Sequence, residues 1–264
     1  MTLPPTAVIP GDDRPAVGSI AHARPVLIAL SRGIPTVNGV TRACGFSKST
    51  VHRVLKTLEK HGLVVQDPVN RHYYLGPLVQ QLNTDPAAPH RKFINDAREE
   101  MQSLARLTEE TVALDILVGL RYVPLFEIPS GHDLKVTMGS KKIGPEFSDL
   151  YAGATVKVLL SQLPREELNF VLENITLAPE TSSTVVDQNV LRAQLEEIRR
   201  AGVCITRGER IPGTVCIAAP VRHYFLPAVM SVVGPENRVY QRLQANVEQL
   251  KKHAVRISNR VKEL

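Results

Sequence analysis

Residues 47–63 read SKSTVHRVLKTLEKHGL, and this stretch predicts one amphipathic helix. Ser47 is a favourable N-cap, and Gly62 is a favourable residue to end the helix. Between them, apolar side chains recur at helical spacing, at Val51, Val54, Leu55 and Leu58. The opposite face is polar and basic, so the helix offers one side to a core and the other to a charged partner.

The residues around this helix predict a winged helix-turn-helix. Thr36 can cap a shorter helix, and residues 44–46 (Cys-Gly-Phe) supply the turn before Ser47. Two short strands, 63–66 and 72–75, follow across a turn that contains Pro and Asn. A helix that opens at Ser19 or His22 completes a three-helix domain with a hairpin wing.

The basic face supplies the candidate DNA contacts. A recognition helix presents its first turns and outward side to the major groove, and the tip of a wing meets phosphate or the minor groove. The predicted contacts are Lys48, Ser49, Thr50, His52, Arg53, Lys56 and Arg71. His52 has an alternative role, because its ring can pack beside the wing. The alternative for the whole domain is a three-helix module whose basic face is merely solvated.

Charge is distributed unevenly along the 264 residues. Residues 1–82 carry 9 Lys and Arg against 4 Asp and Glu, which gives +5, whereas residues 83–264 carry 23 against 22. The hydrophobic fraction of 43% is ample for buried cores in two domains. A basic domain joined to a nearly neutral one indicates a module for binding polyanions attached to a module with another task.

Cysteine usage and hydropathy exclude several other classes. Cys44, Cys204 and Cys216 lie far apart with no CxxC pair, which predicts reduced thiols in the cytoplasm and neither a disulfide framework nor a zinc site. No His or acidic cluster has metal-ligand spacing, so no metal or cofactor is expected. No apolar run approaches the roughly 18 residues that span a bilayer, so no membrane association is expected.

The domain plan follows from composition and periodicity. Residues 1–18 are rich in Pro and predict a flexible tail, residues 19–82 form the winged domain, and residues 83–90 form a linker. Residues 91–264 alternate helical and strand patterns, which predicts an α+β domain. Its expected strands are 111–117, 121–128, 134–138, 203–206, 214–221 and 228–233, and a helix from about 235 closes the chain.

Three motifs resemble the IclR family of bacterial transcription regulators from about His22 onward. The first is residues 46–55 (FSKSTVHRVL) with LEKHGL at 58–63. The second is residues 150–160 (LYAGATVKVLL), and the third is residues 208–221 (GERIPGTVCIAAPV) with MSVVGP at 230–235. The resemblance implies a C-terminal domain like a GAF or PAS fold, in which helices flank an antiparallel sheet. It also implies a small-molecule effector and a homodimer or dimer of dimers on palindromic operator DNA.

The resemblance also implies which residues bind the effector, because in this family the effector pocket lies against the second and third motifs. The matching positions are Tyr151, Ala154, Thr155, Thr206, Thr214, Cys216, Ser231 and Val233. Ala154 and Thr155 can offer backbone amides to a carboxylate, and Ser231 or Thr214 can offer a hydroxyl. Val156 stands where the family commonly has Gly, and Val233 where it often has Ser. These changes favour a bulkier or more apolar effector, such as an aromatic acid, over a small polar acid.

Two other functions fit parts of the pattern. One is an enzyme that uses Cys216 or Ser231 with a His, its front domain serving as a dimer module. Cys216 lies in an apolar strand, where a free Cys is more often a small buried hydrophobe. The other is a regulator that has lost its ligand and responds to a partner protein, which a site filled by protein side chains would favour.

Overall fold

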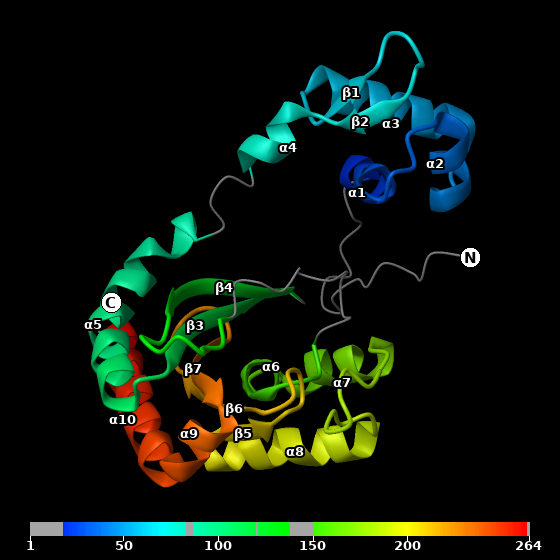
Figure 1. Ribbon diagram of the computed structural model, residues 1–264. Helices are drawn as coiled ribbons and strands as arrows, with labels where there is room; N and C mark the ends of the chain where they lie inside the picture. The colour runs from blue at the N-terminus through cyan, green and yellow to red at the C-terminus, as the bar shows by residue number, and fades with distance from the viewer. Residues whose placement is uncertain (1–17, 83–86, 120, 138–149, 263–264) are drawn as a thin grey trace. The chain divides into compact units, whose positions relative to one another are not determined.

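The computed structural model describes residues 18–82, 87–119, 121–137 and 150–262, and the chain divides into two compact units at Pro86/Ala87. The predicted tail therefore lies outside the described residues, apart from Gly18, as do linker residues 83–86. The first unit is called the winged unit here, and the second the C-terminal unit. Figure 1 shows the elements of each.

The winged unit has the predicted order of elements. Helices α1 (Gly18–Ser31), α2 (Val37–Cys44) and α3 (Lys48–Lys60) precede the hairpin β1 (Val64–Gln66) and β2 (Tyr73–Leu75), and α4 (Pro77–Leu82) follows. Its core is a single apolar cluster that includes Val26, Val40, Leu55 and Tyr73. The backbone N–H of Tyr73 donates to Pro35 O at 2.8 Å, which ties the hairpin to the segment between α1 and α2.

The C-terminal unit is built on an antiparallel sheet of order β4-β3-β7-β6-β5. Its strands are β3 (Thr111–Val118), β4 (Arg121–Ile128), β5 (Cys204–Arg207), β6 (Thr214–Val221) and β7 (Ala228–Pro235). All five match expected strands. Most of β3, β6 and β7 is buried, because helices cover both faces of the sheet.

Side chains alternate between two cores along each central strand. Val112, Leu114 and Met230 belong to the cluster under α5 (Arg91–Thr108) and α10 (Leu243–Lys262), which pack side by side. Ala218 and Val229 belong to the second cluster, under α6 (Ala154–Ser161), α7 (Arg165–Asn174) and α8 (Gln188–Ala201). The second face of the sheet is called the α6 face here, and it carries the residues of the predicted effector site.

Three expectations are corrected. Residues 134–137 form no strand, and Leu134 is 70% exposed; Met138 lies outside the described residues. The closing helix is two helices, α9 (Glu236–Gln241) and α10, which separate at Arg242. Residues Ala88–His90, placed in the linker by composition, form the 3-10 helix η1, and His90 is buried with its Nδ1 2.6 Å from Tyr224 Oη. These residues therefore pack with the C-terminal unit.

Candidate DNA-binding and effector-binding sites

Both helices of the helix-turn-helix are capped by side chains. The hydroxyl of Thr36 accepts from Gly39 N at 3.1 Å, and that of Ser47 accepts from Thr50 N at 3.2 Å. Gly45 follows α2 with a φ of 71°, a left-handed conformation that most side chains disfavour. The sharp turn between α2 and α3 therefore depends on one glycine and one serine, both evident in the sequence.

Most of the predicted DNA contacts share the exposed side of α3. Lys48, Ser49, His52, Arg53 and Lys56 are all exposed, whereas Val51, Leu55 and Leu58 are buried on the opposite side. The exposed position of His52 leaves its ring on the polar face of the helix. One face of α3 therefore carries three cationic side chains, one hydroxyl and one imidazole.

Two of the predicted contacts also have roles inside the unit. The hydroxyl of Thr50 is half-buried and lies 2.9 Å from Ser47 Oγ, so it belongs to the cap. Lys56 Nζ donates to Glu59 Oε2 at 2.8 Å and to Gln66 Oε1 at 3.3 Å, which joins α3 to the wing. Lys48 and Arg53 are therefore the better candidates for cations that meet DNA.

The tip of the wing is shaped by side-chain oxygens. Asp67 Oδ1 accepts from Val69 N at 2.8 Å, and Asn70 Oδ1 accepts from His72 N at 2.8 Å. Arg71 follows with a φ of 62°, a left-handed conformation for a residue that is not glycine, and its side chain is exposed. The wing thus holds one cation at the end of a well-defined turn.

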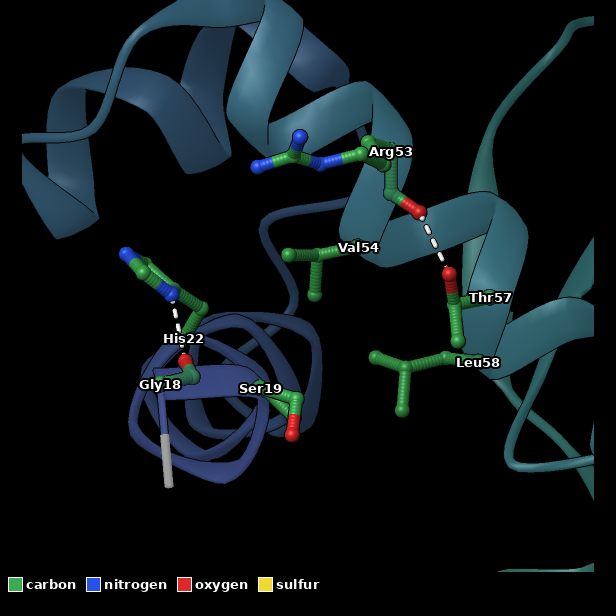
Figure 2. A pocket seen from close by; sticks show the side chains of 8 residues that line it. Gly18, Ser19, His22, Arg53, Val54, Thr57 and Leu58 are labelled. Atoms are coloured by element: carbon green, nitrogen blue, oxygen red, sulfur yellow. Dashed lines mark hydrogen bonds between the residues drawn. The ribbon is translucent and has the colours of Figure 1, made fainter. Parts of the chain in front are cut away.

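A groove of about 410 Å3 lies between the N-terminal end of α1 and α3. Figure 2 shows its lining: Gly18, Ser19 and His22 on one side and Arg53, Val54, Thr57 and Leu58 on the other. Thr57 Oγ1 donates to the carbonyl of Arg53 at 2.9 Å. No feature of the sequence pointed to this groove.

On the α6 face, the first amides of α6 already have partners. Gly153 N donates to Glu209 Oε2 at 2.9 Å, and Ala154 N donates to Thr206 Oγ1 at 3.1 Å. Gly153 has a φ of 90°, and a Cβ there would lie 3.0 Å from Arg210 Cδ. The amide that Ala154 was expected to offer to an effector thus bonds to the Thr206 hydroxyl within the chain, and the Glu209 carboxylate takes the neighbouring amide at the start of α6.

Glu209 is the partner of a second buried group on α6. Lys157 Nζ lies 2.6 Å from Glu209 Oε1 and 2.8 Å from Gln194 Oε1 on α8, and its side chain is 1% exposed. One carboxylate thus caps the helix and neutralises a buried lysine. The pair fixes α6 against the third motif and α8.

A polar cluster occupies the middle of the α6 face. It comprises Asp115, Tyr122, Thr155, Arg210, Cys216 and Ser231. Tyr122 Oη donates to Asp115 Oδ1 at 2.9 Å. Burial raises the pKa of Asp115 to about 7; the hydrogen bond from Tyr122 opposes this rise, and the charge of Glu127 adds to it. Burial likewise raises the pKa of Tyr122, with further rises from the Asp115 charge and hydrogen bond.

Three polar atoms of this cluster are buried and make no hydrogen bond to a described residue. Within the described residues, Asp115 Oδ2, Ser231 Oγ and Arg210 Nε have no hydrogen-bond partner. Arg210 Nε lies 3.9 Å from Glu180 Oε2, beyond hydrogen-bonding distance. Buried polar groups normally find partners, so these atoms form the part of the α6 face with open hydrogen-bonding capacity.

Cys216 lies beside Thr155 in the same cluster. Its Sγ is 3.8 Å from Thr155 Oγ1. Burial raises the pKa of Cys216 to about 11; the Thr155 hydrogen bond lowers it, the Asp115 charge raises it, and the Arg210 charge lowers it. A thiol with this pKa is almost fully protonated near neutral pH, and Ser231 Oγ makes no hydrogen bond to any described residue, so no base is positioned to take its proton. The geometry gives no support to an enzyme that uses Cys216 or Ser231.

The other predicted effector residues divide between the cluster and its surroundings. Thr206 and Val233 are buried, and Val233 pairs with Cys216 across β6 and β7. Tyr151 is buried and donates its hydroxyl to Ala178 O at 2.6 Å, and Thr214 donates its hydroxyl to Ile211 O at 2.7 Å. The hydroxyls of Tyr151 and Thr214 are thus used in holding loops.

Sequence reasoning missed Asp115, Tyr122 and Arg210. Asp115 had a visible signal, because it is the only charged residue in the otherwise apolar run TVALDILV of β3. A charge in a buried strand needs a partner or a function. Tyr122 and Arg210 had no such signal, because their approach to the α6 face depends on the register of β4 and on the loop before β6.

The described residues contain neither a metal site nor a membrane-spanning helix. No group of three or more His, Cys, Asp or Glu side chains there is placed to hold a metal ion. None of the helices described is both long enough and apolar enough to cross a membrane.

Comparison with known proteins identifies both units. Residues 19–68 match the IclR helix-turn-helix domain, and residues 87–259 match the family described as bacterial transcriptional regulator IclR C-terminal. HTH-type transcriptional regulator KdgR of Escherichia coli (strain K12) is 32% identical over 215 residues, which cover 80% of each chain.

Solved structures show the same fold. A putative IclR transcriptional regulator from Silicibacter sp. TM1040 aligns with a TM-score of 0.69 at 23% identity, over 93% of this chain and 96% of that chain. An IclR homolog from Microbacterium hydrocarbonoxydans, complexed with 4-hydroxybenzoate, aligns with a TM-score of 0.60 at 22% identity, over 93% of this chain and 100% of that chain. The chain therefore belongs to the IclR family of transcriptional regulators, with an N-terminal helix-turn-helix that binds DNA and a C-terminal domain that binds an effector.

Proposed function

We propose that this regulator binds operator DNA through Lys48, Ser49, His52 and Arg53 on α3 and through Arg71 on the wing. The observation that carries the proposal is the single exposed face of α3, which gathers these α3 side chains opposite a buried apolar face. Thr50 and Lys56 contribute mainly by shaping that face, because their polar atoms already bond within the unit. The protein acts in the cytoplasm, where the bacterial chromosome is accessible.

The effector that we propose is an organic acid, with aromatic acids as the first class to test. The IclR homolog from Microbacterium hydrocarbonoxydans, which shares this fold, binds 4-hydroxybenzoate, an aromatic acid, in its crystal structure. Val233 pairs with Cys216 on the α6 face and Val156 is buried on α6, so both positions are apolar. Effector binding there would change operator affinity by linkage between the two sites.

We further propose that the protein forms a homodimer or a dimer of dimers. The two-fold symmetry of a dimer places two recognition helices on the two half-sites of a palindromic operator. Light scattering of the purified full chain, with and without operator, gives the mass directly. A monomer on a single half-site would exclude this assembly.

The experiment for DNA binding titrates full-length protein onto its own upstream intergenic DNA over a salt series. We expect specific binding to weaken steeply with salt, with a slope of roughly −0.9 for each phosphate neutralised. Arg53→Ala should abolish the preference for that DNA over random DNA.

Arg32→Ala is the matched control, because Arg32 is exposed in the same unit but lies outside α3 and the wing. It should retain the preference for the upstream DNA. Equal losses in Arg53→Ala and Arg32→Ala would show that bulk charge, rather than the face of α3, controls binding. Absence of any preference in the wild type would reject a local operator.

A further inference from the structure

We propose that Asp115 determines effector specificity by accepting a hydrogen bond from a hydroxyl or amino group of the effector, with Ser231 beside it. This inference rests on the proposed function, and it narrows the effector from organic acids in general to acids that carry a second, donating group. The inference is based on Asp115, Ser231 and Arg210. Each of these residues has one buried polar atom that makes no hydrogen bond to a described residue.

The sheet register places Asp115 and Ser231 together. Asp115 pairs with Val229 and Ala113 pairs with Ser231 between β3 and β7, so Asp115 and Ser231 are diagonal neighbours on one face. Val229, on that same face, belongs to the apolar cluster under α6. Both polar side chains are 0% exposed, so Asp115 Oδ2 and Ser231 Oγ point into a protein interior without a partner.

The chemistry of Asp115 selects the complementary group. Oδ1 is already occupied by the Tyr122 hydroxyl, which leaves Oδ2 as the open acceptor. When Asp115 is ionised, a carboxylate on the effector would face this oxygen with like charge, which is unfavourable in a buried site. A hydroxyl or an ammonium group would instead donate to it, and Ser231 can accept or donate beside it.

Arg210 supplies the opposite chemistry to the same cluster. Its charge acts on both Tyr122 and Cys216, so it lies near them; its buried Nε forms a long ion pair with Glu180 Oε2 at 3.9 Å but makes no hydrogen bond within the described residues. A guanidinium N–H binds a carboxylate well. The cluster therefore matches a hydroxy or amino acid whose donating group meets Asp115 and whose carboxylate meets Arg210, and it does not match a plain monocarboxylate.

Proton linkage gives a second, independent readout. A donor that binds Oδ2 favours ionised Asp115, so binding releases a proton and tightens as pH rises through about 7. The other ionisable groups around this carboxyl are Tyr122 and Glu127 on β4, Cys216 on β6 and Arg210. The pKa of Tyr122 and that of Cys216 are both raised, so these groups stay neutral over this range.

The test uses ligand pairs in which methylation removes the donor, and Asp115→Asn separates loss of the donor from the added bulk of the methyl groups. Calorimetry on the full chain compares 4-hydroxybenzoate with 4-methoxybenzoate, 4-aminobenzoate with 4-dimethylaminobenzoate, and lactate with 2-methoxypropanoate. We expect the donor-bearing member of at least one pair to bind at least tenfold more tightly. We also expect Asp115→Asn, which turns the open acceptor into a donor, to remove that preference, while Asp133→Asn on an exposed loop preserves it.

The outcomes separate this inference from the proposed function. Equal affinity within every pair, an unchanged preference in Asp115→Asn, or no binding by any of the six probes overturns the role of Asp115. Loss of operator recognition in the wild type would instead overturn the proposed function. The pair preference is measured in the wild type, so it stands as a test even if Asp115→Asn fails to fold, and the pH dependence supplies a further check.

Discussion

The charged side chains of the DNA-binding face are exposed to solvent, whereas those of the α6 face are buried. On α3, Lys56 and Glu59 form an ion pair at 2.8 Å with side chains 44% and 31% exposed, and the cations Lys48 and Arg53 are exposed on the same helix. On the α6 face, Lys157 and Glu209 lie 2.6 Å apart with side chains 1% and 9% exposed. Exposed cations remain free to exchange counterions for phosphates, whereas buried charges are bound to fixed partners and tolerate few changes.

The same contrast appears in how each site is assembled. The DNA-binding face comes from one helix and one nearby turn, within residues 47–71. The polar cluster combines β3, β4, α6, β6, β7 and the loop before β6. A local motif thus creates a solvated, tolerant site, and a sheet creates a buried, selective one.

The largest expected difference between the two sites follows removal of one lysine. Lys157→Met leaves the Glu209 carboxylate buried without its cation, which should lower the free energy of unfolding by about 3–5 kcal/mol. Lys56→Met removes an exposed pair and should change it by less than about 1 kcal/mol. Denaturant unfolding of each full-length variant measures both.

The double variant Lys157→Met with Glu209→Gln tests the cause. It removes the uncompensated charge and should recover part of the lost stability, because the amide oxygen can still accept from Gly153 N. If the double variant is as unstable as Lys157→Met, packing around the lysine stem rather than the charge dominates.

Asp115 should give the C-terminal unit a pH dependence that the exposed site lacks. Its pKa is about 7 in the folded protein and about 4 when unfolded, so between these values the folded state holds one more proton. Its contribution to the free energy of unfolding is therefore fully present below about pH 4 and is lost as pH rises through about 7. The full change is on the order of 4 kcal/mol.

Asp115→Asn removes this titration. Urea unfolding from pH 4.5 to 8 should show the wild type losing stability relative to the variant as pH rises. Tyr122→Phe removes a hydrogen bond that lowers the pKa of Asp115, so its loss of stability should extend to higher pH. Parallel curves for wild type and Asp115→Asn would mean that Asp115 is ionised throughout.

The winged unit shows how far local sequence determines structure. Both predicted caps, Thr36 and Ser47, make the expected hydrogen bonds, and the hairpin forms around Asp67 and Asn70. These contacts join residues at most three apart, so the sequence pattern contains nearly all the information they need. The five strands of the second unit were predictable for the same reason, from apolar runs and alternation.

The polar cluster was less predictable because it depends on distant pairings. A register shift between Leu114 and Asp115 sets Asp115 opposite Pro124 and brings Tyr122 within reach of its carboxyl. No local sequence pattern predicts this β-bulge. The false strand at 134–137 has the converse explanation, because alternation there has no neighbouring strand to pair with among the described residues.

A smaller effect is expected from the cap of the recognition helix. Ser47→Ala removes the acceptor for Thr50 N, which should destabilise the protein by about 1 kcal/mol. The Ser47 hydroxyl also lies 2.9 Å from Ser49 Oγ and Thr50 Oγ1, so the first turn of α3 should loosen and specific DNA binding should weaken. Hydrogen exchange at Thr50 N reports the cap directly, and Ser47→Asp should restore it.

The smallest expected effect comes from the wing tip. Arg71→Asn removes one cation and keeps a side chain that tolerates the left-handed φ of 62°, so the turn should persist. If Arg71 meets a phosphate, operator and random DNA should lose affinity equally, and the slope of log affinity against log salt should fall by roughly 1. Because Arg71 is exposed, the free energy of unfolding should hardly change, in contrast to Lys157→Met. A selective loss on the operator would instead show that Arg71 reads bases in the minor groove, and the wing would then share sequence recognition with α3.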